Sequence, residues 1–198
     1  MSRQHYVLDN PPGDALGAQM VQGALEYLED HNLHMGNPFQ EVLDDQLVHY
    51  GWVDQDQQAV ATLVDDFRTP VRYLIIEAMT PQEVERIRTW LGEYLDFIPL
   101  ADLEQEAREQ MAESPATLIR LASGGPEEYT STTYEVVQAG LQHPDPSVQY
   151  AAAFGAGLLQ WPEFVADLDA LLRRSSDDNV RTVATRALES CQRRVQAS

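Results

Sequence analysis

Apolar residues recur along most of the chain at the three- and four-residue spacing that lets an α-helix bury one face. This spacing appears in six stretches, at residues 21–28, 39–50, 60–67, 84–98, 164–172 and 180–191. Pairs of a capping residue and a proline mark helix starts near them: Asn37-Pro38, Thr69-Pro70, Thr80-Pro81, Ser114-Pro115 and Asp145-Pro146. The pattern therefore predicts helices over these six stretches.

One segment has the composition of a strand. Residues 71–76 are rich in β-branched and aromatic side chains. They directly follow the helix-start pair Thr69-Pro70 and continue into Glu77-Ala78-Met79, so we interpret them as a buried helix. The run at residues 6–8 is too short to build a sheet alone. The fold class that the pattern favours is therefore all-α.

A repeat is visible near the end of the chain. Val148 and Val180 are 32 residues apart, and so are Ala152 and Ala184. Val148 and Ala152 lie in one expected helix, and Val180 and Ala184 lie in another. We expect a shorter amphipathic helix before each of them, at about residues 130–142 and 162–174. Helix pairs that recur at this interval are typical of an α-solenoid.

Residues 130–194 resemble HEAT repeats, in which an Asp, then Val-Arg, then small residues mark the second helix of each repeat. The residues that carry the resemblance are Asp145-Pro146-x-Val148 with the alanine-rich stretch after it, and Asp178-x-Val180-Arg181-x-x-Ala184-x-x-Ala187-Leu188. The chain departs from the pattern at Gln149, where arginine is usual, and at Gly155 and Gly157, which lower helix propensity.

The resemblance implies a HEAT-like helical-repeat α-solenoid with an N-terminal helical region. HEAT-like repeats would occupy residues 124–198, and an acidic helical region would occupy residues 1–123. A fainter match at Thr69-Pro70-Val71-Arg72 places a degenerate repeat near residues 55–80. The motif is informative about the fold and carries almost no information about function.

The charge of the chain is strongly negative. Its 198 residues include 32 acidic residues and 13 basic residues, for a formal net charge of −19. Such a charge argues against direct binding of nucleic acid, which needs a basic surface, and against binding of anionic membranes. A basic partner protein would be attracted to this field, although acidity can also serve solubility alone.

The residue inventory excludes several kinds of active site. All 13 basic residues are arginine, so no lysine is present for a phosphate loop or a Schiff base. The single Cys191 excludes an internal disulfide and lies on an inward helical stripe, so we expect it in the core. No apolar run approaches 18 residues, and residues 1–5 lack the apolar stretch of a secretory signal. We therefore expect a cytoplasmic protein without a membrane span.

One pair of histidines has the spacing of metal ligands, His31-x-x-His34. A third ligand is not apparent, and Gly36 and Pro38 end the expected helix there, so we interpret the pair as a polar helix end. No catalytic Ser or Cys arrangement occurs. We expect no catalytic residues, no cofactor and no metal.

Acidic residues are concentrated in the first third of the chain, where residues 1–66 hold 12 acids and one arginine. Two aromatic residues, Tyr50 and Trp52, lie among them. Acids that attract and aromatics that fix a partner in place suggest a surface for a basic protein. The candidate contact residues are Asp44, Asp45, Tyr50, Trp52, Asp54, Asp56, Asp65 and Asp66. The alternative is a solvated helix face with a buried tryptophan.

The second helices of the repeat offer another candidate surface. In a HEAT-like stack these helices line the concave side, which solenoids commonly use for binding. The residues off the apolar stripe that we expect to contact a partner there are Tyr150, Arg181 and Arg186. Ordinary solvated side chains are the alternative.

These features favour a non-enzymatic, protein-binding helical module. Within that class we favour a small bacterial inhibitor or immunity-type protein that covers a basic toxin or nuclease. A structural or adaptor subunit is the alternative. A HEAT-like enzyme acting on nucleic acid is less favoured, because a glycosylase of that kind should carry a basic track that this chain lacks.

Overall fold

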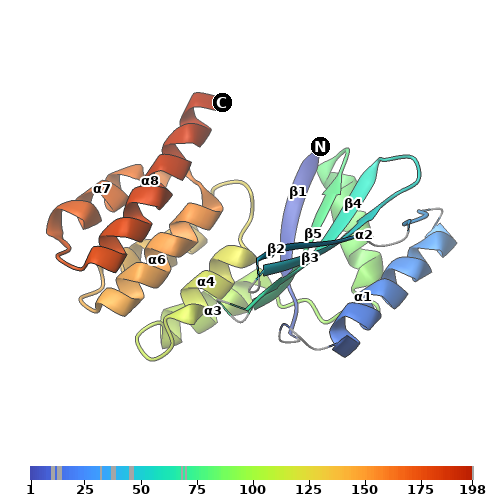
Figure 1. Cartoon of the computed structure of the whole chain (residues 1–198), viewed down its shortest axis with the longest axis horizontal. Helices are drawn as coiled ribbons and strands as arrows, with labels where there is room; N and C mark the ends of the chain where they lie inside the picture. Colours follow the sequence, from blue (N-terminus) through green and yellow to red (C-terminus); the bar gives the residue numbers. More distant parts are fainter. Residues whose placement is uncertain are drawn as a thin grey trace. The chain divides into compact units, whose positions relative to one another are not determined.

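The computed structural model of the chain describes residues 1–9, 12, 15–31, 33–36, 39–44, 47–67, 69 and 71–197 (Figure 1). These residues divide into two compact units, Met1–Ile98, here unit 1, and Pro99–Ser198, here unit 2. Unit 1 combines a sheet with helices, whereas unit 2 is helical. The fold is therefore mixed, and each unit is described by itself.

Unit 1 is built on an antiparallel sheet with the strand order β1-β5-β4-β3-β2. Its strands are β1 (Ser2–Val7), β2 (Phe39–Asp44), β3 (Leu47–Val53), β4 (Ala59–Asp66) and β5 (Val71–Ala78). Its helices are α1 (Ala15–Tyr27), the 3-10 turn η1 (Leu28–His31) and α2 (Pro81–Leu91). The first strand in sequence pairs with the last, so residues 2 and 78 are partners across the sheet.

The core of unit 1 lies between one face of the sheet and its helices. Helices α1 and α2 contribute to the same buried cluster, so both cover the same face. The largest fully buried side chains of this cluster are Leu25, Leu28, Leu63, Leu74, Ile76 and Leu91. Helix α2 begins with a capping box, in which the Glu83 N–H donates to the Thr80 hydroxyl and the Glu83 carboxylate accepts from the Thr80 N–H.

The prediction of an all-α fold is wrong, and so is the N-terminal helical region. Residues 39–44 lie in β2 and residues 47–50 in β3. A register shift between Val42 and Asp44 interrupts the alternation expected of a strand. That interruption makes the apolar spacing of the segment look helical.

The degenerate repeat near residues 55–80 is also wrong, because this region forms β4 and β5. Each of these strands lies between two neighbours in the sheet, and most of its side chains are buried. The run of apolar residues is therefore nearly continuous. A short continuous apolar run fits a helix as well as a strand. The β-branched and aromatic composition of residues 71–76 was the better guide.

The described residues of unit 2 form six α-helices, arranged as three consecutive pairs (Figure 1). They are α3 (Leu100–Gln110), α4 (Ala116–Ser123), α5 (Ser131–Gln142), α6 (Pro146–Leu159), α7 (Val165–Arg174), which follows the 3-10 turn η2 (Pro162–Phe164), and α8 (Asp178–Ala197). The second helices α4, α6 and α8 contact one another in turn, and so do the first helices α3, α5 and α7. The predicted boundary between residues 123 and 124 falls inside this unit.

The helices predicted near residues 130–142 and 162–174 are confirmed as α5 and as η2 with α7. Ala152 and Ala184 are both fully buried at the 32-residue offset. Small residues bring the second helices close together: a Cβ added at Gly155 of α6 would lie 3.1 Å from the Ala122 Cβ of α4. The second helices therefore pack on alanine and glycine.

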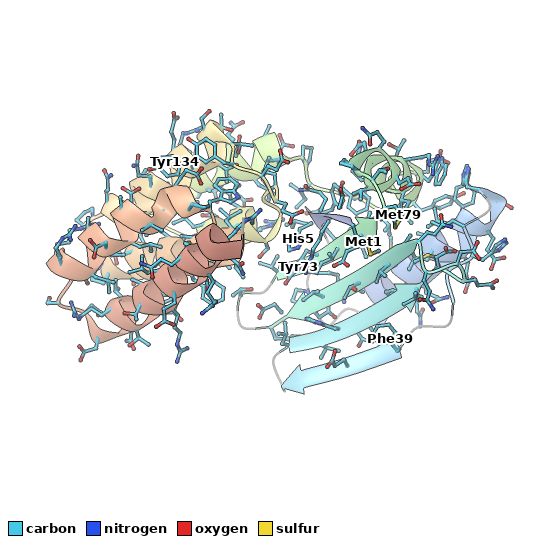
Figure 2. All side chains as sticks on the ribbon, turned by 90° about the horizontal axis from the view of Figure 1, so that it is seen from above. Met1, His5, Phe39, Tyr73, Met79 and Tyr134 are labelled. Carbon is cyan, nitrogen blue, oxygen red and sulfur yellow. The ribbon has the colours of Figure 1, made fainter. Side chains whose placement is uncertain are left out.

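Polar side chains connect the first helices of successive pairs. The Thr133 hydroxyl on α5 donates to Glu104 on α3 at 2.6 Å. The hydroxyl of Tyr134, which is labelled in Figure 2, donates to Asp167 on α7 at 2.7 Å. Burial, and then the hydrogen bond to Asp167, raises the pKa of Tyr134 to about 12. These bonds fix the three pairs in register on the side opposite to the second helices.

Candidate functional site: a groove between α6 and α8

A groove of about 320 Å³ runs along the surface between α6 and α8. Small residues form its floor: a Cβ added at Gly157 would lie 3.2 Å from the Ala187 Cβ, so the two helices approach closely there. Large side chains form the wall on the α6 side, namely Tyr150, Phe154 and Leu158. The close approach below and the large side chains above give the groove its depth.

The α6 wall is an exposed apolar row. Tyr150, Phe154 and Leu158 follow one another at a spacing of four residues, so they share one helix face. Tyr150 and Leu158 are each 41% exposed, while the opposite face of α6 is fully buried. Residues 146–159 contain no charged side chain at all. Contiguous exposed apolar side chains of this kind mark surfaces that bind other molecules.

The α8 wall is polar and basic. Residues 178–197 carry four arginines and two acids, which makes α8 net positive in a chain of charge −19. Arg186 lines the groove and is exposed, and none of the residues that the structure describes forms an ion pair or hydrogen bond with its guanidinium. Ser190 also lines the groove and accepts a hydrogen bond from Arg193 at 2.9 Å. No acidic residue is among the described residues that line the groove.

Two of the three residues predicted on this surface line the groove, Tyr150 and Arg186. Arg181 does not. Its guanidinium donates to the Leu172 carbonyl at 2.6 Å, one of the last carbonyls of α7, which have no partner within their own helix. Sequence reasoning missed Phe154 and Leu158, because an apolar residue on a helix is ordinarily assigned to the core.

Of the two aromatic residues predicted to hold a basic partner, Trp52 is buried and Tyr50 is partly buried. Trp52 is 2% exposed, belongs to the core of unit 1, and donates from its indole nitrogen to the Gln22 side chain at 2.6 Å. Tyr50 is partly buried and packs against the same core. The alternative, a buried tryptophan, is what the structure has.

The predicted acidic residues do not gather in one surface either. Asp54 and Asp56 follow β3, whereas Asp65 and Asp66 pair with its beginning, so the two sets are about 20 Å apart along the strand. Asp65 forms a buried salt bridge with Arg72 at 2.5 Å, and Asp66 is 6% exposed. Asp45 and the side chain of Asp44 lie outside the described residues.

The other chemistry-bearing residues do not build a metal or thiol site. Among the described residues no three His, Cys, Asp or Glu side chains are close enough to hold a metal ion. His31 instead stacks on Trp90 with the ring centres 4.1 Å apart. Cys191 is fully buried, and burial raises the pKa of its thiol to about 11, which makes it a poor nucleophile near neutral pH.

No protein-family model, curated protein or solved structure matches this chain significantly. The resemblance to HEAT repeats therefore stays a prediction, carried by the residues of α6 and α8 alone. Within the described residues, no helix combines the length and the apolarity needed to cross a membrane.

Proposed function

We propose that this chain is a non-enzymatic, protein-binding module, and that the groove between α6 and α8 takes a segment of its partner. The observation that supports the proposal is the exposed row of Tyr150, Phe154 and Leu158 beside Arg186, whose guanidinium has no partner among the described residues. Tyrosine and arginine are enriched among the residues that contribute most to protein interfaces. Burial of this row by a partner would remove apolar surface from water.

The chemistry of the groove defines the partner segment. Because α6 is uncharged and α8 is net positive, the segment that fits is apolar and carries a carboxylate. A helix with apolar side chains on one face and an acidic residue beside them meets both requirements. Its apolar face would contact the α6 wall, and its carboxylate would accept from the Arg186 guanidinium.

Binding at this groove would serve one of two biological roles, inhibition of the partner or assembly with it. An inhibitor or immunity-type protein abolishes the activity of its partner on binding, whereas a structural or adaptor subunit leaves that activity intact. The high negative charge of the chain favours the inhibitor of a basic toxin or nuclease, since opposite charges accelerate association. Assay of the captured partner with and without this chain separates the two roles.

The experiment that tests the proposal is photo-crosslinking in the cells that make this protein. A photoreactive amino acid replaces Leu158 in the groove or, as a control, Glu189, an exposed residue of α8 outside the groove lining. We expect one protein to crosslink from position 158 and not from position 189. Arg186→Glu in the position-158 variant should abolish that crosslink.

Three results would contradict the proposal. Equal crosslinking from both positions would show that contact is not confined to the groove. An absence of any adduct at position 158, with a stable complex still recovered, would place the partner on another surface. Crosslinks to a second copy of this chain alone would identify the groove as a self-association surface instead.

A further inference from the structure

A second cavity lies in unit 1, at the end of the sheet where β4 begins and β5 ends. It has a volume of about 140 Å³, well above the 10–15 Å³ or so that a single water needs. Ala59 and Ala78 are register partners across β4 and β5 and line the cavity, so only methyl groups fill the sheet at this point. The small side chains leave the space between the sheet and α2.

Asp54 lines this cavity and is only 6% exposed. Its backbone is satisfied, since the Asp54 N–H donates to the Ala59 carbonyl at 2.9 Å. No hydrogen bond or ion pair reaches its carboxylate from any residue in the described part of the chain. An ionised carboxylate can only accept hydrogen bonds. A ligand with an N–H group could therefore donate the hydrogen bond that the described residues do not give to this carboxylate.

Two aromatic side chains, His31 and Trp90, also line the cavity. His31 stacks on Trp90 with an angle of 11° between the rings, and its Nε2 is buried without a hydrogen-bond partner among the described residues. The Arg86 guanidinium lies 5.3 Å from the centre of the Trp90 ring. All three side chains line the cavity, so the Trp90 ring lies beside both His31 and Arg86 there.

The charges of the lining select the ligand. Among the described residues that line the cavity, three carry a carboxylate, Asp54, Asp56 and Glu83, and one carries a guanidinium, Arg86. Glu83 already accepts from Thr80 in the capping box of α2, so Asp54 and Asp56 remain for a ligand. An anion would be repelled, and the described residues here do not provide three groups for a metal ion. An organic cation with N–H donors satisfies both the charge and the missing hydrogen bonds.

We propose that this cavity binds the ammonium or guanidinium group of an organic cation, with the Asp54 carboxylate as its acceptor and Leu33, Ile87 and Trp90 around its apolar stem. The volume admits one such group and not a folded segment. The source is either a free amine or a Lys or Arg side chain of another protein. This site is independent of the groove in unit 2, so each stands or fails alone.

The probes are ethylguanidinium chloride and butylammonium chloride, titrated into the isotopically labelled full-length protein at constant ionic strength. Nuclear magnetic resonance follows the Trp90 indole N–H and the Asp54 and Gln58 backbone amides. We expect saturable shifts at about millimolar concentration, the range open to a ligand of so few atoms. Sodium chloride at the same ionic strength should leave these signals unchanged.

Asp54→Asn keeps the shape of the side chain and removes its charge. We expect it to weaken probe binding by at least about tenfold, because a neutral amide cannot form the charge-assisted hydrogen bond with the cation. Asp96→Asn is the matched control: it makes the same change in net charge at an exposed site outside the cavity. It should bind the probes within about twofold of wild type.

A short alanine-based peptide with one arginine tests the source of the group. If it shifts the same signals with higher affinity than ethylguanidinium, the cavity takes a side chain of another protein; if only the free amines bind, the ligand is a small molecule. Absence of saturable shifts with both probes would overturn the proposal and leave Asp54 to water alone. Equal binding by Asp54→Asn and wild type would overturn it as well.

Discussion

The second helices of unit 2 meet on smaller side chains than those that fill the core of unit 1. The core of unit 1 is filled by Trp52 and by many leucine and isoleucine residues between a sheet face and two helices. In unit 2 the second helices meet on alanine and glycine, and α6 alone buries Ala151, Ala152, Ala153, Gly155 and Ala156. Large side chains separate the sheet of unit 1 from its helices, whereas small side chains let the second helices of unit 2, α4, α6 and α8, approach one another closely.

Differences in side-chain size account for the positions of both candidate sites. Because small residues fill the contact between α6 and α8, the large apolar residues of α6 are left on its outer face and form the groove. In unit 1 the cavity arises in the reverse way, where two alanines interrupt a core of large side chains. Both candidate sites therefore lie where the local side-chain size departs from its surroundings.

The largest effect should follow from removing the largest side chain of the unit 1 core. Trp52→Ala should lower the free energy of unfolding of unit 1 by about 3–5 kcal/mol, since it loses buried area and leaves a void. Denaturant unfolding followed at the ¹⁹F signal of fluorinated Trp90 measures it. Met79→Ala, at a side chain 57% exposed, is the control and should change little. A loss below about 1 kcal/mol would contradict the core position of Trp52.

The complementary change in unit 2 is an enlargement. Ala184 is fully buried where α8 packs, so Ala184→Leu should overpack the contact and cost about 1–3 kcal/mol. The ¹⁹F signal of fluorinated Trp161 reports the unfolding of unit 2. Thr185→Leu, at the adjacent exposed position, should have a much smaller effect. If the two variants unfold alike, close packing of small residues is not what holds α8 in place.

A smaller effect is expected from the buried thiol on α8. Burial raises the pKa of Cys191 from 9.0 to about 11, so the thiol of the unfolded chain ionises first as the pH rises. The contribution of the neutral buried thiol to the free energy of unfolding is complete below pH 9 and is lost as the pH rises toward 11. Wild type should therefore lose about 1 kcal/mol more than Cys191→Ala between roughly pH 8 and pH 10. Parallel pH profiles for the two proteins would show that the thiol is not desolvated.

The sequence was sufficient for most of unit 2 because its contacts are local. Each helix pairs with the next, and caps such as Asp145, which accepts from the Ser147 N–H at 2.8 Å, mark the starts. Unit 1 depends on pairing between distant segments, as when Ser2 meets Ala78, and apolar spacing alone contains no signal for such pairing.

The candidate sites follow the same division. Tyr150 and Arg186 were predicted together because the repeat aligns their helices, whereas the exposure of Phe154 and Leu158 depends on how closely α6 and α8 approach. Asp54 and Asp56 were predicted as partner contacts, but as part of one acidic surface with Trp52. The neighbourhood of His31 and Asp54 arises from the bridge between Met35 and Asp54, which no local pattern encodes.

The central claim, that the groove between α6 and α8 receives a partner segment with a carboxylate, is tested most directly by one affinity ratio. The dissociation constant of the crosslinked partner, once purified, is measured for wild type, Arg186→Glu and Arg108→Glu, the last being an exposed arginine of α3 with no partner among the described residues. The two variants carry the same net charge. We predict that Arg186→Glu weakens binding by at least about tenfold, while Arg108→Glu stays within about twofold of wild type. Equal weakening by both variants would show that only the overall charge matters, and would contradict the claim.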